Sequence, residues 1–466
     1  MLWISLDRAA NSPLIQQVYM QIRKKILSGE LMAAEKLPST RQLADLLGIS
    51  RNVVLEAYDQ LLAEGFLVSK RGAGTFVAEG AYLPSGKSIA FQKVTNEEEV
   101  MSEPSIIQFR SGIPALDLFP RRIWGKLTQS ICYEVEASAF NYDVPQGRPE
   151  LREALSKYVK NARGIECHPE QIVITTGATQ AFTLASKLLV SPGAELVIED
   201  PITSDIQVIF TNHGAKLIPV PVDDSGIQTC LLPQDTKPAF VFVTPSHQFP
   251  LGGVLSIQRR VELIQYARKR NSYIVEDDYD SEFRYEGAPI PSLQGLAPDR
   301  VLYVGSFSKL LSPSLRLGYL ILPPEFIDRG RKEKWFLDLH TPSLNQLVLA
   351  RFIQEGHLER HLMKMRKSYK KKRERLIDCL HDAFTGEMKV LGASTGLHLI
   401  VEFRGRTFTE RTMERMRTCG VFVDSVESHA IKKGSHLERI ILGYGHLSME
   451  QIEEGVRRLQ QALTFD

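Results

Sequence analysis

A lysine stands in the run Ser306-Phe307-Ser308-Lys309, and Arg316 follows it after a short interval. A lysine amine can form a Schiff base with an aldehyde. Hydroxyl groups and a guanidinium close to that amine can hold a phosphate dianion. An aldehyde and a phosphate are both parts of pyridoxal phosphate. We therefore expect Lys309 to form the Schiff base, and Ser306, Ser308 and Arg316 to bind the phosphate.

A second segment could contribute to the same phosphate site. The run Thr175-Thr176-Gly177-Ala178-Thr179-Gln180 follows an apolar strand and opens a helix. Backbone amides at a helix N-terminus attract anions. We expect Gly177, Ala178 and Thr179 to cradle the phosphate, although glycine at such turns is also common for packing reasons.

A third segment could contact the cofactor ring. Glu276-Asp277-Asp278-Tyr279-Asp280 follows the strand Tyr273-Ile274-Val275, and burying so many carboxylates is costly unless a cation uses one of them. Asp277 could keep a pyridine nitrogen protonated, and Tyr279 could donate to the phenolic oxygen. A solvated lysine is the ordinary alternative for Lys309 alone, but these segments together weigh against it.

Short β-branched runs alternate with helical stretches from Ile106 onward, as in Ile172-Val173-Ile174, Leu196-Val197-Ile198 and Phe240-Val241-Phe242-Val243. This alternation predicts an α/β domain, in which helices cover both faces of a large and mostly parallel sheet. A segment from about Thr341 to the C-terminus predicts a smaller α/β subdomain. These elements must bring the three segments together.

Composition limits the classes of protein that are possible. A chain of 466 residues exceeds what one core usually organises, so we expect at least two domains. The formal net charge of +2 requires any DNA affinity to come from a local patch. The five scattered cysteines have no metal-ligand spacing and are typical of free thiols. No apolar run has membrane-spanning length and no signal peptide is evident, so we expect a cytoplasmic protein without a membrane partner.

The first 78 residues predict a separate module, joined to the rest by a polar linker over 79–105. Ser39-Thr40-Arg41-Gln42 is a capping box that opens a helix with Leu43, Leu46 and Leu47 on one side, and Gly48 ends this helix. Ser50 is then the N-cap of a helix that turns Val54, Tyr58, Leu61 and Leu62 inward. Two short helices joined by a tight turn are typical of a helix-turn-helix.

A two-stranded wing follows the two helices. Its tip, Lys70-Arg71-Gly72-Ala73-Gly74, is basic and rich in glycine, as suits a segment that reaches DNA phosphates. A small helical bundle with a hairpin is the alternative. The basic tip and the pair Arg51-Asn52 at a helix start favour DNA binding.

This module resembles the GntR-type winged helix over its whole length. The resemblance rests on the run Lys36-Leu37-Pro38-Ser39-Thr40-Arg41-Gln42, on the Ser-Arg-Asn start of the second helix and on the wing. It implies that double-stranded promoter DNA is a partner. The DNA-contacting positions would be Arg41, Ser50, Arg51, Asn52, Lys70, Arg71 and Gly72. Arg51 and Asn52 would discriminate bases, and the others would mainly contact phosphate.

The chain from about Ile106 to its C-terminus resembles fold-type I aminotransferases, which bind pyridoxal 5'-phosphate. The run Tyr142-Asp143-Val144-Pro145-Gln146-Gly147-Arg148 completes the set of segments that carries this resemblance. The family implies a dimer in which Tyr142 reaches the phosphate of the partner subunit. A winged helix fused to such a domain resembles the MocR/GabR branch of GntR regulators, and Thr244-Pro245-Ser246-His247-Gln248-Phe249-Pro250 is close to that branch's own motif. The branch implies a head-to-tail, domain-swapped homodimer in which an amino compound displaces Lys309 and forms an external aldimine.

Several positions depart from the aminotransferase pattern. Phe249 replaces an asparagine, so His247 or Gln248 could make the hydrogen bond to the ring oxygen instead. Ile202-Thr203 stands where an aromatic side chain usually stacks on the ring. Ile441 stands where many relatives have an arginine that binds the substrate carboxylate. Arg439 would share its strand face and could partly substitute as an effector ligand, or could be only a surface residue.

Three functions fit these observations. The first is a transcription regulator that binds promoter DNA and senses a small amino compound through the aminotransferase-like domain, with little or no enzymatic turnover. The second is an active aminotransferase that carries a DNA-binding arm. The third, a repressor with an inert dimerisation domain, is disfavoured by the retained Lys309, Asp277 and Arg316. The missing aromatic and arginine favour sensing, because transamination needs two substrates held in repeatable geometry.

Overall fold

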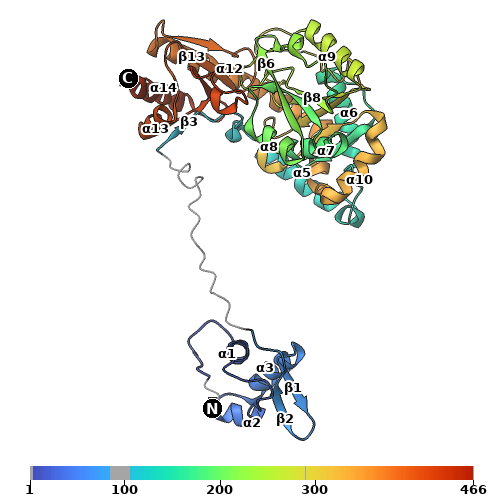
Figure 1. Ribbon diagram of the computed structural model, residues 1–466, viewed down its shortest axis with the longest axis vertical. Coiled ribbons are helices and arrows are strands. Elements are labelled where there is room, and N and C mark those ends of the chain that lie inside the picture. Colours follow the sequence, from blue (N-terminus) through green and yellow to red (C-terminus); the bar gives the residue numbers. More distant parts are fainter. Residues whose placement is uncertain (1–3, 84–104, 289, 465–466) are drawn as a thin grey trace. The chain divides into compact units, whose positions relative to one another are not determined.

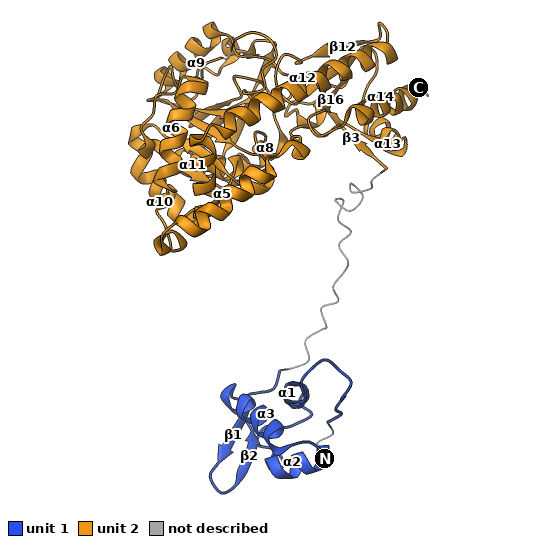
Figure 2. Cartoon of the chain, turned by 180° about the vertical axis from the view of Figure 1, so that it is seen from behind, with its two compact units in different colours: residues 1–97 blue, residues 98–466 orange. Residues whose placement is uncertain are grey.

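The computed structural model describes residues 4–83, 105–288 and 290–464. The chain forms two compact units, residues 1–97 and 98–466, which are coloured separately in Figure 2. Most of the expected linker, 79–105, lies outside the described residues, so its extent stays a prediction.

The first unit has the expected helix-turn-helix and wing. Its helices are α1 (Leu14–Leu27), α2 (Thr40–Leu47) and α3 (Arg51–Ala63), and its antiparallel hairpin is β1 (Leu67–Lys70) with β2 (Gly74–Val77). Ser39 and Gln42 form the capping box, and Gly48 adopts the left-handed conformation that ends α2.

The packing of this unit differs from expectation at two positions. Leu43 is buried with Val54, Tyr58 and Leu61, but Leu46 is exposed. Ser50 is the N-cap residue of α3, yet its side chain makes no capping hydrogen bond. The hydroxyl group of Ser50 therefore remains available at the start of the second helix.

A large mixed sheet organises the second unit (Figure 1). Its strand order is β4-β11-β10-β9-β8-β5-β6-β7, and the central pairs from β10 to β6 are parallel. The strands are β4 (Ile172–Thr175), β5 (Glu195–Asp200), β6 (Lys216–Asp223), β7 (Gly226–Ile227), β8 (Phe240–Val243), β9 (Tyr273–Asp278), β10 (Val301–Ser306) and β11 (Gly318–Ile321). This arrangement confirms the expected fold class.

Helices cover both faces of this sheet because alternate strand residues are apolar on both sides. Phe240 and Phe242 pack with α7 (Ala178–Leu189) and α8 (Ser204–Asn212), whereas Val241 and Val243 pack with α9 (Ile257–Arg270). The helices α5 (Arg121–Glu134), α6 (Pro149–Arg163), α10 (Ile327–Asp338) and α11 (Ser343–Gln354) complete the cover. Among the described residues, no helix is long and apolar enough to cross a membrane.

A four-stranded sheet of order β12-β13-β16-β15 forms the core of the smaller subdomain. Its strands are β12 (Met388–Leu391), β13 (His398–Phe403), β15 (Asp424–Ser425) and β16 (Arg439–Gly443). The helices α12 (His357–Ala383), α13 (Glu410–Thr418) and α14 (Met449–Thr464) belong to the same part of the chain. A short parallel pair, β3 (Ile107–Gln108) with β14 (Val421–Phe422), ties the start of the unit to this subdomain.

A buried ion pair connects α6 to the end of β9. The guanidinium Nε of Arg163 lies 2.6 Å from Oδ2 of Asp278, and both side chains are at most 3% exposed. The Tyr303 hydroxyl also donates to Asp278, over 2.7 Å. Removing one partner of such a pair leaves a charge buried without compensation.

We predict that Arg163→Met lowers the free energy of unfolding by about 3–5 kcal/mol, because Asp278 then loses its buried cation. Urea unfolding of the full chain measures this. The matched control on the same helix is Lys160→Met, which removes an exposed ion pair with Glu166. Equal effects of the two substitutions would contradict the importance of the buried pair.

Candidate functional site

A cavity of about 530 Å³ lies in the second unit. Its lining includes Thr244 after β8, Asp277 in β9 and Ser306 in β10. All three are at the carboxyl ends of parallel strands, where open α/β sheets bind ligands. The lining also includes residues of the smaller subdomain, so both parts of this unit shape the cavity.

Lys309 lines this cavity and is half-buried. Burial lowers the pKa of its amine, and the nearby Asp280 and Asp277 carboxylates oppose that shift. A depressed amine pKa increases the fraction of neutral amine, which is the nucleophilic form. Gly112 has a positive φ of 74°, and a Cβ on it would lie 2.8 Å from the Lys309 Nζ. Any larger residue at position 112 would therefore crowd the Lys309 amine.

The expected phosphate ligands Ser306, Ser308, Arg316, Ala178 and Thr179 all line the cavity. The helix α7 begins directly after Gly177, whose φ is 88°. A Cβ on Gly177 would lie 2.8 Å from a terminal nitrogen of Arg316. The same guanidinium donates to the Thr176 carbonyl over 2.6 Å. Gly177 does not line the cavity itself, but its lack of a side chain allows Arg316 to approach the helix N-terminus. The hydroxyl, guanidinium and helix N-terminal donors of the cavity together fit a phosphate group.

Four carboxylates are buried around the end of β9, and three of them have protein partners. Glu276 accepts from the Ser292 hydroxyl over 2.7 Å, Asp278 pairs with Arg163, and both Asp280 oxygens lie 3.0 Å from the His247 Nδ1.

Asp277 is the exception. It lines the cavity, and its carboxylate makes no hydrogen bond or ion pair with any described residue. Burial raises its pKa well above the ordinary value, and the Asp278 and Asp280 charges raise it further. A cationic ring N–H would relieve this cost, so Asp277 fits a pyridinium nitrogen.

Tyr279, His247 and Asp280 form one hydrogen-bonded group. The Tyr279 hydroxyl donates to the His247 carbonyl over 2.9 Å and lies 3.1 Å from its Nδ1. Tyr279 and Asp280 line the cavity, whereas His247 is buried behind them. The Gln248 amide donates to the Pro201 carbonyl instead. Of the three candidates for the ring-oxygen hydrogen bond, the geometry therefore favours Tyr279, with His247 positioning it.

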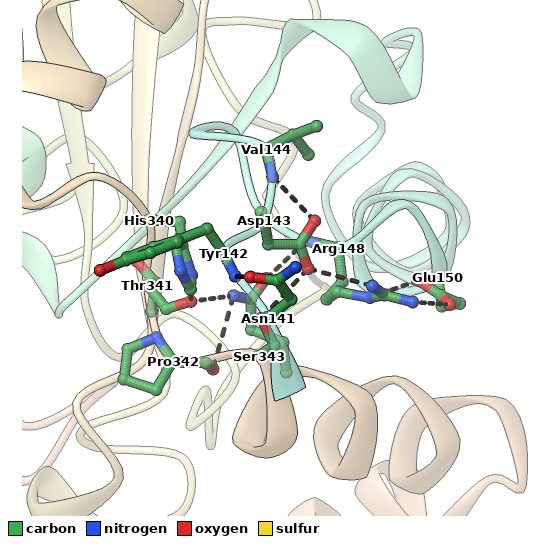
Figure 3. Close-up of polar contacts among 12 residues, drawn as sticks. Asn141, Tyr142, Asp143, Val144, Arg148, Glu150, His340, Thr341, Pro342 and Ser343 are labelled. Carbon is green, nitrogen blue, oxygen red and sulfur yellow. Dashed lines mark hydrogen bonds and ion pairs between the residues drawn. The ribbon is translucent and has the colours of Figure 1, made fainter. Parts of the chain in front are cut away.

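Tyr142 does not line the cavity of its own chain. Figure 3 shows it on the loop before α6, where Asp143 pairs with Arg148 over 3.0 Å and the Ser343 hydroxyl donates to Asp143. The Tyr142 ring meets His340 edge-on at 6.2 Å between centroids, and 75% of the residue is exposed. A rigid loop with an exposed tyrosine suits a contact with a second subunit, which stays a prediction.

The departures from the aminotransferase pattern are visible in the cavity. Ile202, Thr203 and Phe249 line it. Ile441 is fully buried. Arg439 donates to Glu402 over 2.7 Å and is not among the lining residues, so the geometry gives no support to its expected role as an effector ligand.

Several lining residues carried no clear signal in the sequence. Arg110, His398, Asp424 and His429 come from short or irregular segments, and only the tertiary fold brings them to the cavity. His398 directly follows a Gly-Leu pair at a strand start, a pattern shared by many structural histidines.

The expected DNA-contacting positions of the first unit are all exposed: Arg41, Ser50, Arg51, Asn52, Lys70, Arg71 and Gly72. The Arg51 Nε donates to the Thr40 hydroxyl over 3.4 Å, which links the two helices at their N-termini. The Lys70 amine lies 5.2 Å from the centroid of the Phe76 ring on the wing. These positions present their polar groups to solvent, as binding to DNA requires.

Comparisons with known proteins agree with both units. The aminotransferase class I and II family model matches residues 106–459, and the model of bacterial regulatory proteins of the gntR family matches residues 14–77. The chain is 34% identical to the probable rhizopine catabolism regulatory protein MocR of Rhizobium meliloti, over 98% of this chain and 95% of that protein. It is 31% identical to the pyridoxine biosynthesis transcriptional regulator PdxR of Corynebacterium glutamicum, over 85% of each.

A solved structure supports the fold of the second unit. The α-aminoadipate aminotransferase LysN of Thermus thermophilus, complexed with N-(5'-phosphopyridoxyl)-L-leucine, has a TM-score of 0.72 and 29% identity. The match covers 79% of this chain and 94% of that one.

Glu199 gives a prediction about pH. It is fully buried and accepts from the Thr244 hydroxyl over 2.6 Å, and burial raises its pKa to about 7. The folded protein therefore keeps a proton that the unfolded chain releases above its ordinary pKa of 4.5. The stabilisation from this raised pKa is fully present below pH 4.5 and is lost as the pH rises towards 7, by about 1.4 kcal/mol per pH unit.

Glu199→Gln should remove this contribution, so the difference in unfolding free energy between variant and wild type should change between about pH 4.5 and 7. Chemical denaturation at a series of pH values measures it. A constant difference across this range would show that the Glu199 carboxyl group has no raised pKa.

Arg51 gives a prediction about DNA. Arg51→Ala should weaken binding to the cognate site by about 1–3 kcal/mol and relax its sequence preference, because a base contact is lost. Lys70→Ala should weaken binding to all sequences and lower the salt slope by about 1. Gel-shift titrations at several salt concentrations measure both effects. Lys24→Ala, an exposed change on α1, is the control, and an equal loss for Lys24 and Arg51 would contradict the assignment.

Proposed function

Because this chain belongs to the MocR/GabR-type branch of the GntR family, we propose that it regulates transcription in response to an amino compound that its aminotransferase-like domain binds with pyridoxal phosphate. The relatives MocR and PdxR carry regulator names, and the gntR match supports DNA binding. The single observation that carries the sensing part is the cavity in which Lys309, Arg316 and an unpartnered Asp277 meet.

Each end of the cofactor has candidate residues in the cavity. Arg316, Ser306, Ser308 and the first turn of α7 would hold the phosphate, with the guanidinium fixed against the Thr176 carbonyl. Asp277 would hold the ring nitrogen and Tyr279 the ring oxygen. When bound, the cofactor supplies an aldehyde carbon at which primary amines exchange. Lys309 would supply the amine that meets this carbon, and its lowered pKa favours the neutral, nucleophilic form of that amine.

Sensing explains the departures better than turnover does. A catalytic aminotransferase must hold two substrates in repeatable geometry. Here Thr203 lines the cavity where a stacking aromatic is expected, and Ile441 replaces the carboxylate-binding arginine. A regulator needs only a difference in the free energy of binding between two states of the protein. Such a difference can be generated without fast chemistry.

We further propose a head-to-tail homodimer. Tyr142 is supported on its loop by Asp143 and Arg148 but faces solvent. Other large side chains of the same unit, Tyr133, Phe140 and Phe336, are also at least 60% exposed. A second copy could cover such exposed side chains, and Tyr142 could then reach the partner's cofactor phosphate.

The experiment that tests this function combines absorbance with DNA binding. Purified full-length protein, loaded with pyridoxal phosphate, is titrated with a panel of amino compounds, and its own upstream DNA is titrated in parallel. We expect a cofactor band that one class of amines changes, together with at least a fivefold change in DNA affinity, typical of an allosteric coupling energy. Lys309→Ala should lose both the band and the response to the amine.

Lys332→Ala, an exposed lysine on α10, is the control and should retain both responses. Steady keto-acid production with DNA binding indifferent to the amine would overturn the proposal. It would favour the alternative, an active aminotransferase with a DNA-binding arm. The similarity to the aminotransferase LysN is the observation that supports this alternative.

A further inference from the structure

One face of the small sheet borders the cofactor cavity. In the register, His398 on β13 lies opposite Gly443 on β16, and Ile441 on β16 lies opposite Asp424 on β15. Directly opposed residues of neighbouring strands project from the same face of a sheet. His398 and Asp424 both line the cavity, and the aliphatic Ile441 lies on the strand between them.

This face offers no guanidinium to the cavity. Ile441 occupies the position of the carboxylate-binding arginine of many relatives. Its cross-strand neighbours are Ile400 on one side and Asp424 on the other, so the one charged neighbour is a carboxylate. Arg439 is on the same strand face, but its guanidinium forms an ion pair with Glu402 directly opposite, at 2.7 Å between nitrogen and carboxylate oxygen. This part of the cavity therefore presents a carboxylate where a carboxylate-binding site would present a cation.

His398 adds a buried acceptor. Only 2% of the residue is exposed, and its Nε2 lies 3.0 Å from the Pro250 carbonyl, which can only accept. Nε2 must therefore carry the proton, and Nδ1 is left with a lone pair. Burial lowers the pKa of this histidine to about 3, so the ring is neutral. Among the described residues no hydrogen bond to Nδ1 is formed, so His398 adds an acceptor and no positive charge to the cavity lining.

Asp424 is half-buried, and among the described residues its carboxylate makes no hydrogen bond or ion pair. Burial raises its pKa, and the charges of Arg110 and Arg417 oppose that shift without direct contact. Asp205 supplies a second carboxylate to the cavity lining from the first turn of α8. Arg110 is the one cation of the lining besides Lys309 and Arg316, and it is exposed. Away from the expected cofactor ligands, acceptors therefore outnumber cations.

We infer that the effector carries two amino groups, one that reacts at the Lys309 position and a second, as an ammonium, that pairs with Asp424. The ligand class is diamines and diamino acids, and in a diamino acid the carboxylate could pair with Arg110. This inference rests on the proposed function and names the chemistry of its effector. Monoamines and ω-amino acids lack the ammonium that Asp424 requires.

The test uses the full chain loaded with pyridoxal phosphate and follows the cofactor absorbance. The probes are α,ω-diamines of three to six carbons, lysine and ornithine, and the matched monoamines and ω-amino acids. For the best compound with two amino groups, we expect the half-maximal change in cofactor absorbance at a concentration at least about tenfold lower than for its matched monoamine and ω-amino acid. This margin corresponds to a charged hydrogen bond in a partly buried site.

Two substitutions of Asp424 locate the interaction. Asp424→Asn and Asp424→Ser should each reduce the advantage of the second amino group by about tenfold, with the monoamine response unchanged. The cofactor band and the thermal unfolding midpoint show that each variant folds and stays loaded. Asp378→Asn, an exposed carboxylate on α12, is the matched control and should behave as wild type.

The outcomes separate this inference from the function on which it rests. A preference for an ω-amino acid or a monoamine, or an advantage of diamines that survives both Asp424 variants, overturns the inference and leaves a cofactor-dependent sensor intact. Absence of any amine response in a protein that shows the Lys309-dependent band overturns both.

Discussion

The burial of four carboxylates around one strand end is the constraint on which the second unit depends. Isolated buried charges are too costly to persist, so each must be paired, protonated or reserved for a ligand. Arg163 pairs with Asp278, His247 with Asp280, and the hydroxyl and amides of residues 292–294 satisfy Glu276. Of these four carboxylates, that of Asp277 alone faces the cavity without a partner among the described residues. The large sheet, α6 and the turn after β9 thus build a site for a cation at one fixed position.

The sequence predicts much of this because its signals are local. Short apolar runs that alternate with helical stretches predict the sheet, a capping box marks α2, and the run from Ser306 to Lys309 lies where a strand ends. The sequence singles out Asp277 for the ring nitrogen, but it does not predict the partners of the neighbouring carboxylates, because Arg163 and His247 lie far from Asp278 and Asp280 in the chain. Leu46 shows a similar limit: its spacing suggests burial, but the side chain is exposed in the folded unit. The inward faces of His398 and Asp424 depend on strand register, which only the folded sheet defines.

The same fold explains how recognition could differ from that of the related enzymes. The residues expected to bind the cofactor line the cavity, as in the aminotransferases that this chain resembles, yet the small-sheet residues that border the cavity, His398 and Asp424, are acceptors. Since this sheet belongs to the smaller subdomain, a ligand that contacts both Lys309 and Asp424 would bridge the two parts of the second unit. A ligand that binds one arrangement of these parts better than another shifts their populations. Such a shift is the physical basis on which an amino compound could alter DNA binding.

The most direct test of the central claim compares Asp277→Asn with wild type in equilibrium titrations of pyridoxal phosphate, followed by absorbance. The account predicts that the variant keeps or raises its unfolding midpoint, because a buried unpaired carboxylate is removed, while cofactor affinity falls at least about tenfold and the band changes position. Wild-type affinity and an unchanged spectrum in Asp277→Asn would contradict the claim that this carboxylate is held for the cofactor ring.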